Sequence, residues 1–309
     1  MKSFQRIAAG VLVILLSFIL LITSACSSQD TTDTNSKLFI WEISSETTHV
    51  YLLGSVHIAN QDLYPLDNTI EDAFDSARYL VVEVNTNNLT QTAAMDLLLE
   101  YGTYPEGDSF KKHVSEELYN KLDEQFQQYG IAMALLNDYK PFVIYNLMSQ
   151  YMLESFGYKF SYGIDLYFMN KAEESNKDIL ELETSEFQMS LLSSVPDESI
   201  IKTMEYDIDN PETGKYLEDL FNAWSDGDAA WMETVVFEAF TEEPDMATYY
   251  EILFDQRNLN MVEKISEFLA DNEVYFVVVG AGHLVGENGL LNLLYNMGYM
   301  VEQLYKSGN

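Results

Sequence analysis

Two histidines in this chain follow glycines at the ends of hydrophobic segments, a pattern that could bring two ring nitrogens to one point. The segments are VYLLGSVH, which ends at His57, and YFVVVGAGH, which ends at His283. Gly54 and Gly280 let the backbone turn sharply as it leaves each strand. If the two strands are neighbours, both imidazoles converge at the edge where open α/β sheets place their sites. Because neutral imidazole is the commonest protein metal ligand, the pair predicts a metal site.

A carboxylate in a third hydrophobic segment extends this prediction. Glu83 lies near the end of YLVVEV, and a buried carboxylate is costly unless it is paired or bound to a cation. With His57 and His283 it would form a divalent-metal site with positions open for water. Such a metal lowers the pKa of bound water to roughly 7 and polarises a carbonyl, so hydrolysis is the expected chemistry. Nitrogen and oxygen ligands without thiolate are compatible with manganese, cobalt or zinc.

Structural explanations of the same residues stay open. A single Gly-x-x-His occurs by chance in many proteins, although two of the four histidines here occupy the matching positions. Glu83 is also explained by a structural ion pair with Arg257 or Arg78. His49 and His113 lack the strand-exit setting and are expected at the surface.

The segments that must position these residues have strand patterns at both ends of the chain and mostly helical patterns between them. Short β-branched and aromatic runs predict strands over 37–43, 48–53, 79–84, 179–182, 274–279 and 299–304. Apolar residues at helical spacing predict helices over 67–77, 116–129, 141–156, 165–175, 186–192, 198–206, 212–223, 229–240, 247–254, 256–270 and 288–296. The predicted fold is α/β (α+β), with a central mixed β-sheet built from the N- and C-terminal segments. One domain spans 37–309, with a large, mostly helical insertion at about 110–270.

The first 25 residues have the pattern of a lipoprotein signal peptide. Lys2 and Arg6 precede an apolar run over 7–22, which closes on small residues before Cys26. The run is shorter than the roughly 20 residues that span a bilayer. Cys26 is the only cysteine, and an unpaired cysteine in an exported protein is explained by lipidation once the signal is cleaved before it. Plain secretion is the alternative.

The polar stretch over 26–36 predicts a flexible tether between the lipidated Cys26 and the folded domain. We therefore expect an exported protein, lipid-anchored to the outer face of the bacterial cell membrane. Acidic residues outnumber basic ones 50 to 16, and the net charge is −34. A surface this acidic repels nucleic acid, so nucleic acid is excluded as a partner. The expected partners are the membrane, through the lipid on Cys26, and a peptide or small-molecule substrate.

Longer stretches around these motifs resemble a known family. They are YLLGSVHIANQDLYPL, YLVVEVN, GIDLYFMNKAEESNKDILELETSEFQ, FDQRNLNMVEKI and VVVGAGHLVGENGLLNLL. Together they are similar to the TraB/GumN family, which is related to the Tiki metalloproteases, and the resemblance runs from about 38 to 304. It implies a metal-dependent hydrolase fold with the two Gly-x-x-His motifs, and hence His57 and His283, at its centre.

The resemblance also implies roles for further residues. It makes Glu83 the acid after the second core strand and matches Asp165, Glu183 and the pair Arg257-Asn258. Arg257 has the chemistry to stabilise an oxyanion or to hold a substrate carboxylate. Asp165 and Glu183 would be a fourth metal ligand, a general base, or structural partners.

The leading hypothesis is a surface-anchored, metal-dependent hydrolase of peptidase-like activity. The main alternative is a non-catalytic lipoprotein that captures haem, a metal or a peptide. A third possibility is a family member that serves as a surface interaction scaffold. The intact motif residues His57, Glu83 and His283 favour the enzyme.

Overall fold

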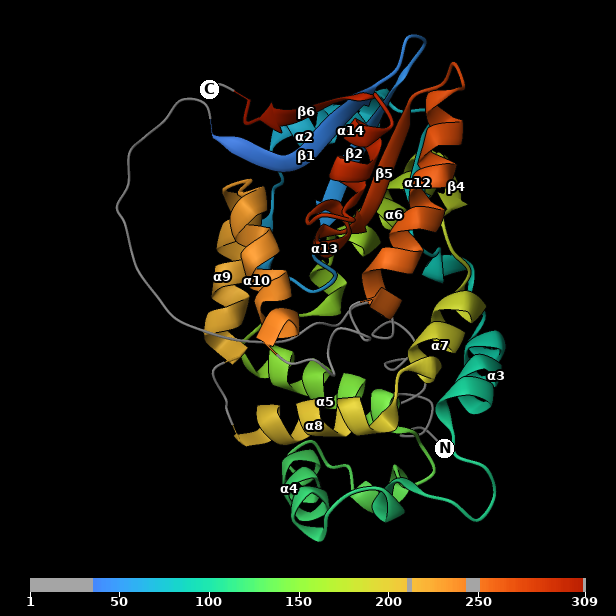
Figure 1. The fold of residues 1–309 in the computed structure, drawn as a ribbon, viewed down its shortest axis with the longest axis vertical. Coiled ribbons are helices and arrows are strands. Elements are labelled where there is room, and N and C mark those ends of the chain that lie inside the picture. The colour runs from blue at the N-terminus through green and yellow to red at the C-terminus, as the bar shows by residue number, and fades with distance from the viewer. Residues whose placement is uncertain (1–35, 210–212, 243–250, 308–309) are drawn as a thin grey trace. The chain divides into compact units, whose positions relative to one another are not determined.

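The computed structural model describes residues 36–209, 213–242 and 251–307, which fall into two compact units (Figure 1). The first unit contains described residues from 86–158 and 185–214. The second contains described residues from 36–85, 159–184 and 215–309. The predicted signal peptide and Cys26 lie outside the described residues. Within the ranges that are described, no helix is both long enough and apolar enough to cross a membrane.

A six-stranded mixed sheet forms the centre of the second unit, with the strand order β4-β3-β5-β2-β1-β6. The strands are β1 (Lys37–Ser44), β2 (His49–Ser55), β3 (Tyr79–Val82), β4 (Asp178–Glu181), β5 (Tyr275–Gly280) and β6 (Met300–Tyr305). Neighbours among β4, β3, β5 and β2 are parallel, whereas β1 is antiparallel to both β2 and β6. A mixed sheet that takes most of its strands from the two ends of the chain confirms the predicted fold class.

Helices cover both faces of this sheet. Its helices are α2 (Asn68–Ser76), α6 (Ile164–Ser175), α9 (Thr213–Ser225), α10 (Ala229–Glu242), α12 (Gln256–Leu269), α13 (Ala281–Leu284) and α14 (Leu290–Asn296). The Phe276 ring of β5 packs against Phe74 of α2 and Phe168 of α6, whereas the adjacent Tyr275 stacks on Phe268 of α12. Because successive strand side chains point to opposite faces, α12 covers the face opposite α2 and α6. A strand enclosed in this way must be apolar throughout, as β5 is.

The first unit is helical. It contains α3 (Gln91–Gly102), α4 (Glu116–Gln127), α5 (Pro141–Ser155), α7 (Ser185–Ser194) and α8 (Asp197–Asp209). Most residues of α5 are buried, and Pro141 occupies its first turn, where the missing N–H removes no helical hydrogen bond. In contrast, α4 buries only the stripe Leu118, Leu122 and Phe126, which explains its clear helical period in the sequence.

Two segments differ from the sequence-based expectation. The helix α3 was not predicted, because its apolar residues Leu97 to Leu99 are consecutive and give no helical period. Thr90 caps this helix by accepting a hydrogen bond from the Ala93 N–H at 3.2 Å. The predicted helix 247–254 lies partly outside the described residues, and its described end belongs to a π-helix, Glu251–Asp255.

One buried acid in the first unit is held by a hydroxyl group. Asp207 of α8 is 2% exposed, and its Oδ2 accepts a hydrogen bond from the Tyr145 hydroxyl of α5 at 2.9 Å. Its Oδ1 has no hydrogen-bond partner among the described residues. Burial raises the pKa of Asp207 to about 8, and the Tyr145 hydrogen bond opposes this only in part. The carboxyl group is therefore protonated in the folded protein at neutral pH.

This protonation predicts a stability that falls as the pH rises. Between the ordinary pKa of 3.8 and the folded value of about 8, the folded state binds a proton that the unfolded state has released. The contribution of Asp207 to the free energy of unfolding is therefore complete below pH 3.8 and is lost as the pH rises toward 8. We expect Asp207→Asn to remove this loss, as measured by urea unfolding from pH 5 to 9. Asp209→Asn, at an exposed acid of the same helix, is the control, and equal pH slopes for Asp207→Asn and wild type would contradict the assignment.

Candidate functional site

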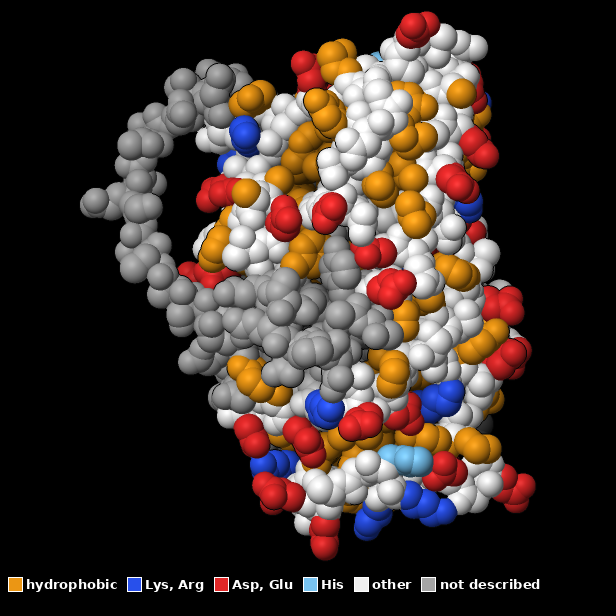
Figure 2. Space-filling model, viewed as in Figure 1, with side chains coloured by type: hydrophobic (Ala, Val, Ile, Leu, Met, Phe, Trp, Pro, Cys, Tyr) orange, Lys and Arg blue, Asp and Glu red, His pale blue; other side chains and the backbone are white. Residues whose placement is uncertain are grey.

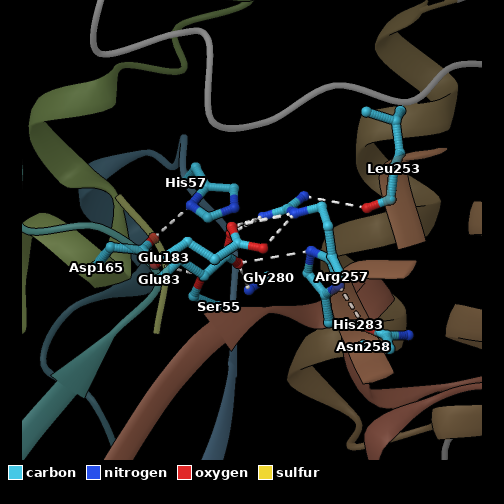
Figure 3. Close-up of polar contacts among 10 residues, drawn as sticks. All are labelled: Ser55, His57, Glu83, Asp165, Glu183, Leu253, Arg257, Asn258, Gly280 and His283. Carbon is cyan, nitrogen blue, oxygen red and sulfur yellow. Dashed lines mark hydrogen bonds and ion pairs between the residues drawn. The ribbon is translucent and has the colours of Figure 1, made fainter. Parts of the chain in front are cut away.

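Four of the predicted site residues, His57, Glu83, Glu183 and His283, follow the carboxyl ends of the parallel strands. Figure 3 shows the side chains of the site. β2 and β5 are neighbours, with Ser55 paired to Gly280 at their ends. His57 follows β2, and His283 lies on α13, which begins directly after β5. Glu83 follows β3, the other neighbour of β5. The strand order therefore brings both motif histidines and Glu83 to the same edge, where ligand sites of open α/β sheets lie.

The two motif glycines are required because other atoms lie where a side chain at either position would be. Neither has a positive φ angle. A Cβ at Gly54 would lie 2.4 Å from the Phe39 ring, and the Gly54 carbonyl accepts a hydrogen bond from Trp224 Nε1 at 2.6 Å. A Cβ at Gly280 would lie 3.0 Å from His57 Nε2 and 3.4 Å from Glu83 Oε1. The absence of a side chain at Gly280 thus leaves a small space bordered by a ring nitrogen and a carboxylate oxygen.

Asp165 fixes the proton on the His57 ring. Its Oδ2 lies 2.7 Å from His57 Nδ1, and its Oδ1 accepts a hydrogen bond from the Ser55 hydroxyl at 2.8 Å. A carboxylate only accepts hydrogen bonds, so Nδ1 carries a proton and Nε2 is the nitrogen left toward Gly280. Burial would lower the pKa of His57, but the Asp165 charge outweighs it and raises the pKa above its ordinary value.

An amide fixes the proton on the His283 ring. Asn258 Nδ2 donates to the Asn288 carbonyl at 2.8 Å, which turns Asn258 Oδ1 toward His283 Nδ1 at 2.6 Å. His283 Nδ1 must therefore donate, and Nε2 is the unprotonated nitrogen. Burial, followed by the positive charge of Arg257, lowers the pKa of His283 to about 3, so this imidazole is neutral. Hydrogen-bonded Nδ1 atoms of this kind are typical of histidines that present Nε2 to a metal.

A buried ion cluster holds Glu83 beside the histidines. Arg257 Nη2 contacts Glu83 Oε2 at 2.5 Å and Glu183 Oε2 at 2.8 Å, and Arg257 Nε also donates to Glu183. Arg257 Nη1 donates to the Leu253 carbonyl at 3.1 Å. Glu83 Oε1 accepts from the Gly280 N–H at 2.7 Å and lies 3.8 Å from His283 Nε2. The side chains of Glu83, Glu183, Arg257 and His283 are all nearly inaccessible to solvent.

The charges in this cluster determine its protonation. Burial would raise the pKa of Glu83, but the positive charge of Arg257 outweighs it and lowers the pKa to about 2. Burial would likewise lower the pKa of Arg257, and the charges of Glu83 and Glu183 raise it instead. Glu83 is therefore ionised, and its carboxylate is shared between Arg257 and the Gly280 N–H. The structural ion pair with Arg257, considered above as an alternative for Glu83, is present.

Comparison with known proteins gives the chain its family. The model of the TraB/PrgY/gumN family matches residues 39–303. The chain belongs to the TraB/PrgY/gumN family. It is similar to the proteins called "Uncharacterized protein YbaP" of Escherichia coli (strain K12) and of Shigella flexneri, each 24% identical over 246 residues, which cover 80% of this chain and 88% of the relative. No solved structure matches.

In this TraB/PrgY/gumN member, six predicted residues and the two motif glycines lie at one edge of the sheet, and two further residues join them. Contacts link Glu83, Glu183, Arg257 and His283. Asp165 contacts His57, whose ring lies beside Gly280 near Glu83. Cys26 lies outside the described residues. Asn258 was noted only as a match to the family pattern, and Ser55 was not singled out. The position of Ser55 inside the first motif was the one signal for it. His113 lies outside this cluster and contacts Asp108.

In this structure Arg257 is the positively charged partner of two carboxylates, those of Glu83 and Glu183. Its Nε, Nη1 and Nη2 all have acceptors, so an oxyanion would bind through the second N–H of Nη1 or by exchange with one of these contacts. That role stays a prediction. Asp165 and Glu183 contact His57 and Arg257 respectively, which favours an orienting or structural role for each over a direct ligand role.

The ion cluster predicts a large stability cost when its cation is removed. Arg257→Met leaves Glu83 and Glu183 buried without a partner, so we expect the free energy of unfolding at pH 7 to fall by about 3–5 kcal/mol. Arg78→Met is the control, because Arg78 is a solvent-accessible arginine that contacts the Tyr79 ring. Urea unfolding of chelator-treated protein measures both. Equal losses for the two variants would show that the cluster is not a stabilising contact.

Proposed function

We propose that this protein is a metal-dependent hydrolase with His57, Glu83 and His283 at its centre. The observation that carries the proposal is the state of the two imidazoles, whose Nδ1 atoms both donate to oxygens, so that Nε2 is the nitrogen of each ring available to a metal. Glu83 Oε1 lies near both, beside the space at Gly280. Two imidazole nitrogens and one carboxylate oxygen are a donor set for zinc, manganese or cobalt.

The buried charges also favour a cation. Glu83, Glu183 and Asp165 place three carboxylates at this edge, and Arg257 contacts the first two. Carboxylates grouped in this way attract a divalent cation, which would add its charge to that of Arg257.

The described residues do not form a ready-made metal cage. Within the described ranges, no group of three His, Cys, Asp or Glu side chains already has the spacing that holds a metal ion. The contacts explain this, because Arg257 and the Gly280 N–H share the Glu83 carboxylate. The donor types, their protonation and the charge fit a divalent cation, so His57, Glu83 and His283 would hold it, with Glu83 exchanging part of its contact to Arg257.

Each residue then has a defined task in hydrolysis. A bound divalent cation would supply a Lewis acid that polarises a carbonyl and lowers the pKa of water. His57 and His283 present Nε2 atoms whose direction is set by Asp165 and Asn258. Arg257 keeps Glu83 ionised down to low pH. Because a bound cation would polarise a carbonyl group, the proposed substrate is a peptide or another acyl compound.

Metal binding tests this proposal directly. We expect the chelator-treated chain from residue 27 onward to bind one Zn²⁺, Mn²⁺ or Co²⁺ per molecule by calorimetry. His57→Ala and His283→Ala should each weaken the affinity by more than about 100-fold, because each removes a ligand. Hydrolysis of a mixed fluorogenic peptide library should be lost with chelator and restored by the metal.

Two further variants serve as controls. His113→Ala removes a histidine outside the site and should leave metal binding unchanged. Gly280→Ala places a methyl group 3.0 Å from His57 Nε2, so we expect it to weaken metal binding while thermal unfolding stays close to wild type. Metal binding that is indifferent to His57→Ala, His283→Ala and Gly280→Ala would rule out the proposed site.

We further propose that the enzyme is exported and anchored by a lipid on Cys26, with the acidic surface facing the exterior. Acidic side chains are scattered over the described surface in Figure 2, where basic ones are fewer, and the chain as a whole carries a net charge of −34. An acidic surface is repelled by anionic lipid. Attachment of this protein to a membrane would therefore need a covalent lipid anchor and not a charged surface.

The anchor predicts where the mature chain begins. After expression in a bacterium, mass spectrometry should find a diacylglycerol-modified Cys26 as the first residue, in the membrane fraction. Cys26→Ser removes the only thiol and should move the protein to the soluble fraction or leave the signal uncleaved. A wild-type chain that is cleaved elsewhere and soluble would contradict lipidation and support plain secretion.

A further inference from the structure

A buried serine inside the first motif contacts the acid that holds His57. Ser55 is 1% exposed, and its hydroxyl donates to Asp165 Oδ1 at 2.8 Å. The other oxygen of the same carboxylate lies 2.7 Å from His57 Nδ1. Both oxygens of Asp165 are thus engaged, one by Ser55 and the other by His57.

Backbone contacts fix the start of α6, which carries Asp165, relative to the segment from Ser55 to His57. The Ile164 N–H at the start of α6 donates to the Val56 carbonyl at 3.1 Å. A Cβ at Gly163 would lie 2.3 Å from the His57 carbonyl oxygen, so only glycine allows the helix to begin this close to the strand exit. Asp165 lies in the first turn of α6. Its backbone is therefore fixed relative to His57, and the remaining freedom is rotation of its side chain.

The Ser55 hydroxyl restricts that rotation. A carboxylate with only one partner can turn about its terminal torsion, which is broad in proteins. The hydrogen bond from Ser55 holds Oδ1 and thereby directs Oδ2 at His57 Nδ1. His57 is half-buried, with 19% of its side chain exposed, so its ring has more room to turn than the enclosed ring of His283.

We propose that Ser55 and Asp165 are positioning residues that act through His57. Together they keep the proton on Nδ1 and the plane of the ring fixed, so that Nε2 faces the space at Gly280 and Glu83 Oε1. The metal-affinity part of this inference rests on the proposed function. The ring-orientation part does not, because it concerns the protein without metal.

The two histidines are positioned by partners of different charge. His283 Nδ1 contacts the neutral amide of Asn258, which is held by the Asn288 carbonyl. His57 Nδ1 contacts a carboxylate. A carboxylate partner raises the basicity of the opposite ring nitrogen more than an amide does. His57 is therefore the stronger donor of the two, and removal of Ser55 or Asp165 weakens the stronger ligand.

The test compares ring tautomer and metal affinity in the same variants. The chain from residue 27 onward is labelled with ¹⁵N-histidine, treated with chelator and examined from pH 6 to 10, so that the neutral form of the imidazole is observed. Long-range ¹H–¹⁵N correlation should show His57 as the Nδ1–H tautomer in the wild type. We expect a mixture of tautomers in Asp165→Ala and a partial shift in Ser55→Ala. In Asp165→Asn, whose amide oxygen still accepts the hydrogen bond, the Nδ1–H tautomer should be retained.

Zn²⁺ titration of the same proteins measures how the orientation of the His57 ring affects the affinity for the metal. We expect Ser55→Ala and Asp165→Ala to weaken affinity by about 10- to 100-fold, as loss of a contact to a metal-binding histidine does, and Asp165→Asn to weaken it less than Asp165→Ala. Ser149→Ala is the matched control, because Ser149 is a fully buried serine whose hydroxyl has no hydrogen-bond partner among the described residues. It should change neither readout.

The outcomes separate this inference from the proposed function. If the His57 tautomer is unchanged in both Ser55→Ala and Asp165→Ala, the positioning role is wrong, whatever the metal does. If Asp165→Ala does not fold, the tautomer of His57 in Ser55→Ala decides the question. If the tautomer shifts as expected but the wild type binds no metal, the positioning role stands and the metal-dependent hydrolase is wrong.

Discussion

The guanidinium of Arg257 joins two buried carboxylates, and the rest of the site depends on this contact. Glu83 and Glu183 follow the neighbouring parallel strands β3 and β4, and the Glu183 N–H donates to the Glu83 carbonyl. Two buried negative charges this close would repel each other without a cation between them. Arg257 supplies that cation from α12 and makes contacts with both. Its contact to the Leu253 carbonyl also ties it to the π-helix that precedes α12.

The order of the strands then decides what lies around Glu83. β5 lies between β3 and β2, so its end reaches both the acid of one neighbour and the histidine segment of the other. Gly280 at that end donates its N–H to Glu83 and leaves free the volume that a side chain would fill. A glycine is needed there because a Cβ would crowd the ring nitrogen of His57. The sheet therefore places Glu83, Gly280 and the His57 segment together, and Arg257 from α12 supplies a positive charge beside Glu83.

The relatives of this chain do not assign a reaction to the site. The similar proteins of Escherichia coli and Shigella flexneri carry the description uncharacterized. The chemistry must be argued from the residues themselves. Two imidazoles with hydrogen-bonded Nδ1 atoms and one ionised carboxylate are the donor types on which the proposed divalent-cation site rests. Because Asp165 and Asn258 differ in charge, the two histidines would differ as ligands.

The local sequence determined the elements and the motif residues. Apolar runs marked the strands that carry His57, Glu83 and His283, and helical spacing marked α4 and α12, because each of these elements faces the core in a regular way. It missed α3, whose apolar residues are consecutive and so lack a period.

Tertiary structure decided the pairings, since they join residues far apart in the chain. The choice of Arg257 over Arg78 for Glu83, the contact from Ser55 through Asp165 to His57, and the burial of Asp207 all depend on which elements pack together. Hydrogen bonds and ion pairs act over a few ångströms, so a sequence can name the residue types but only the fold places their partners.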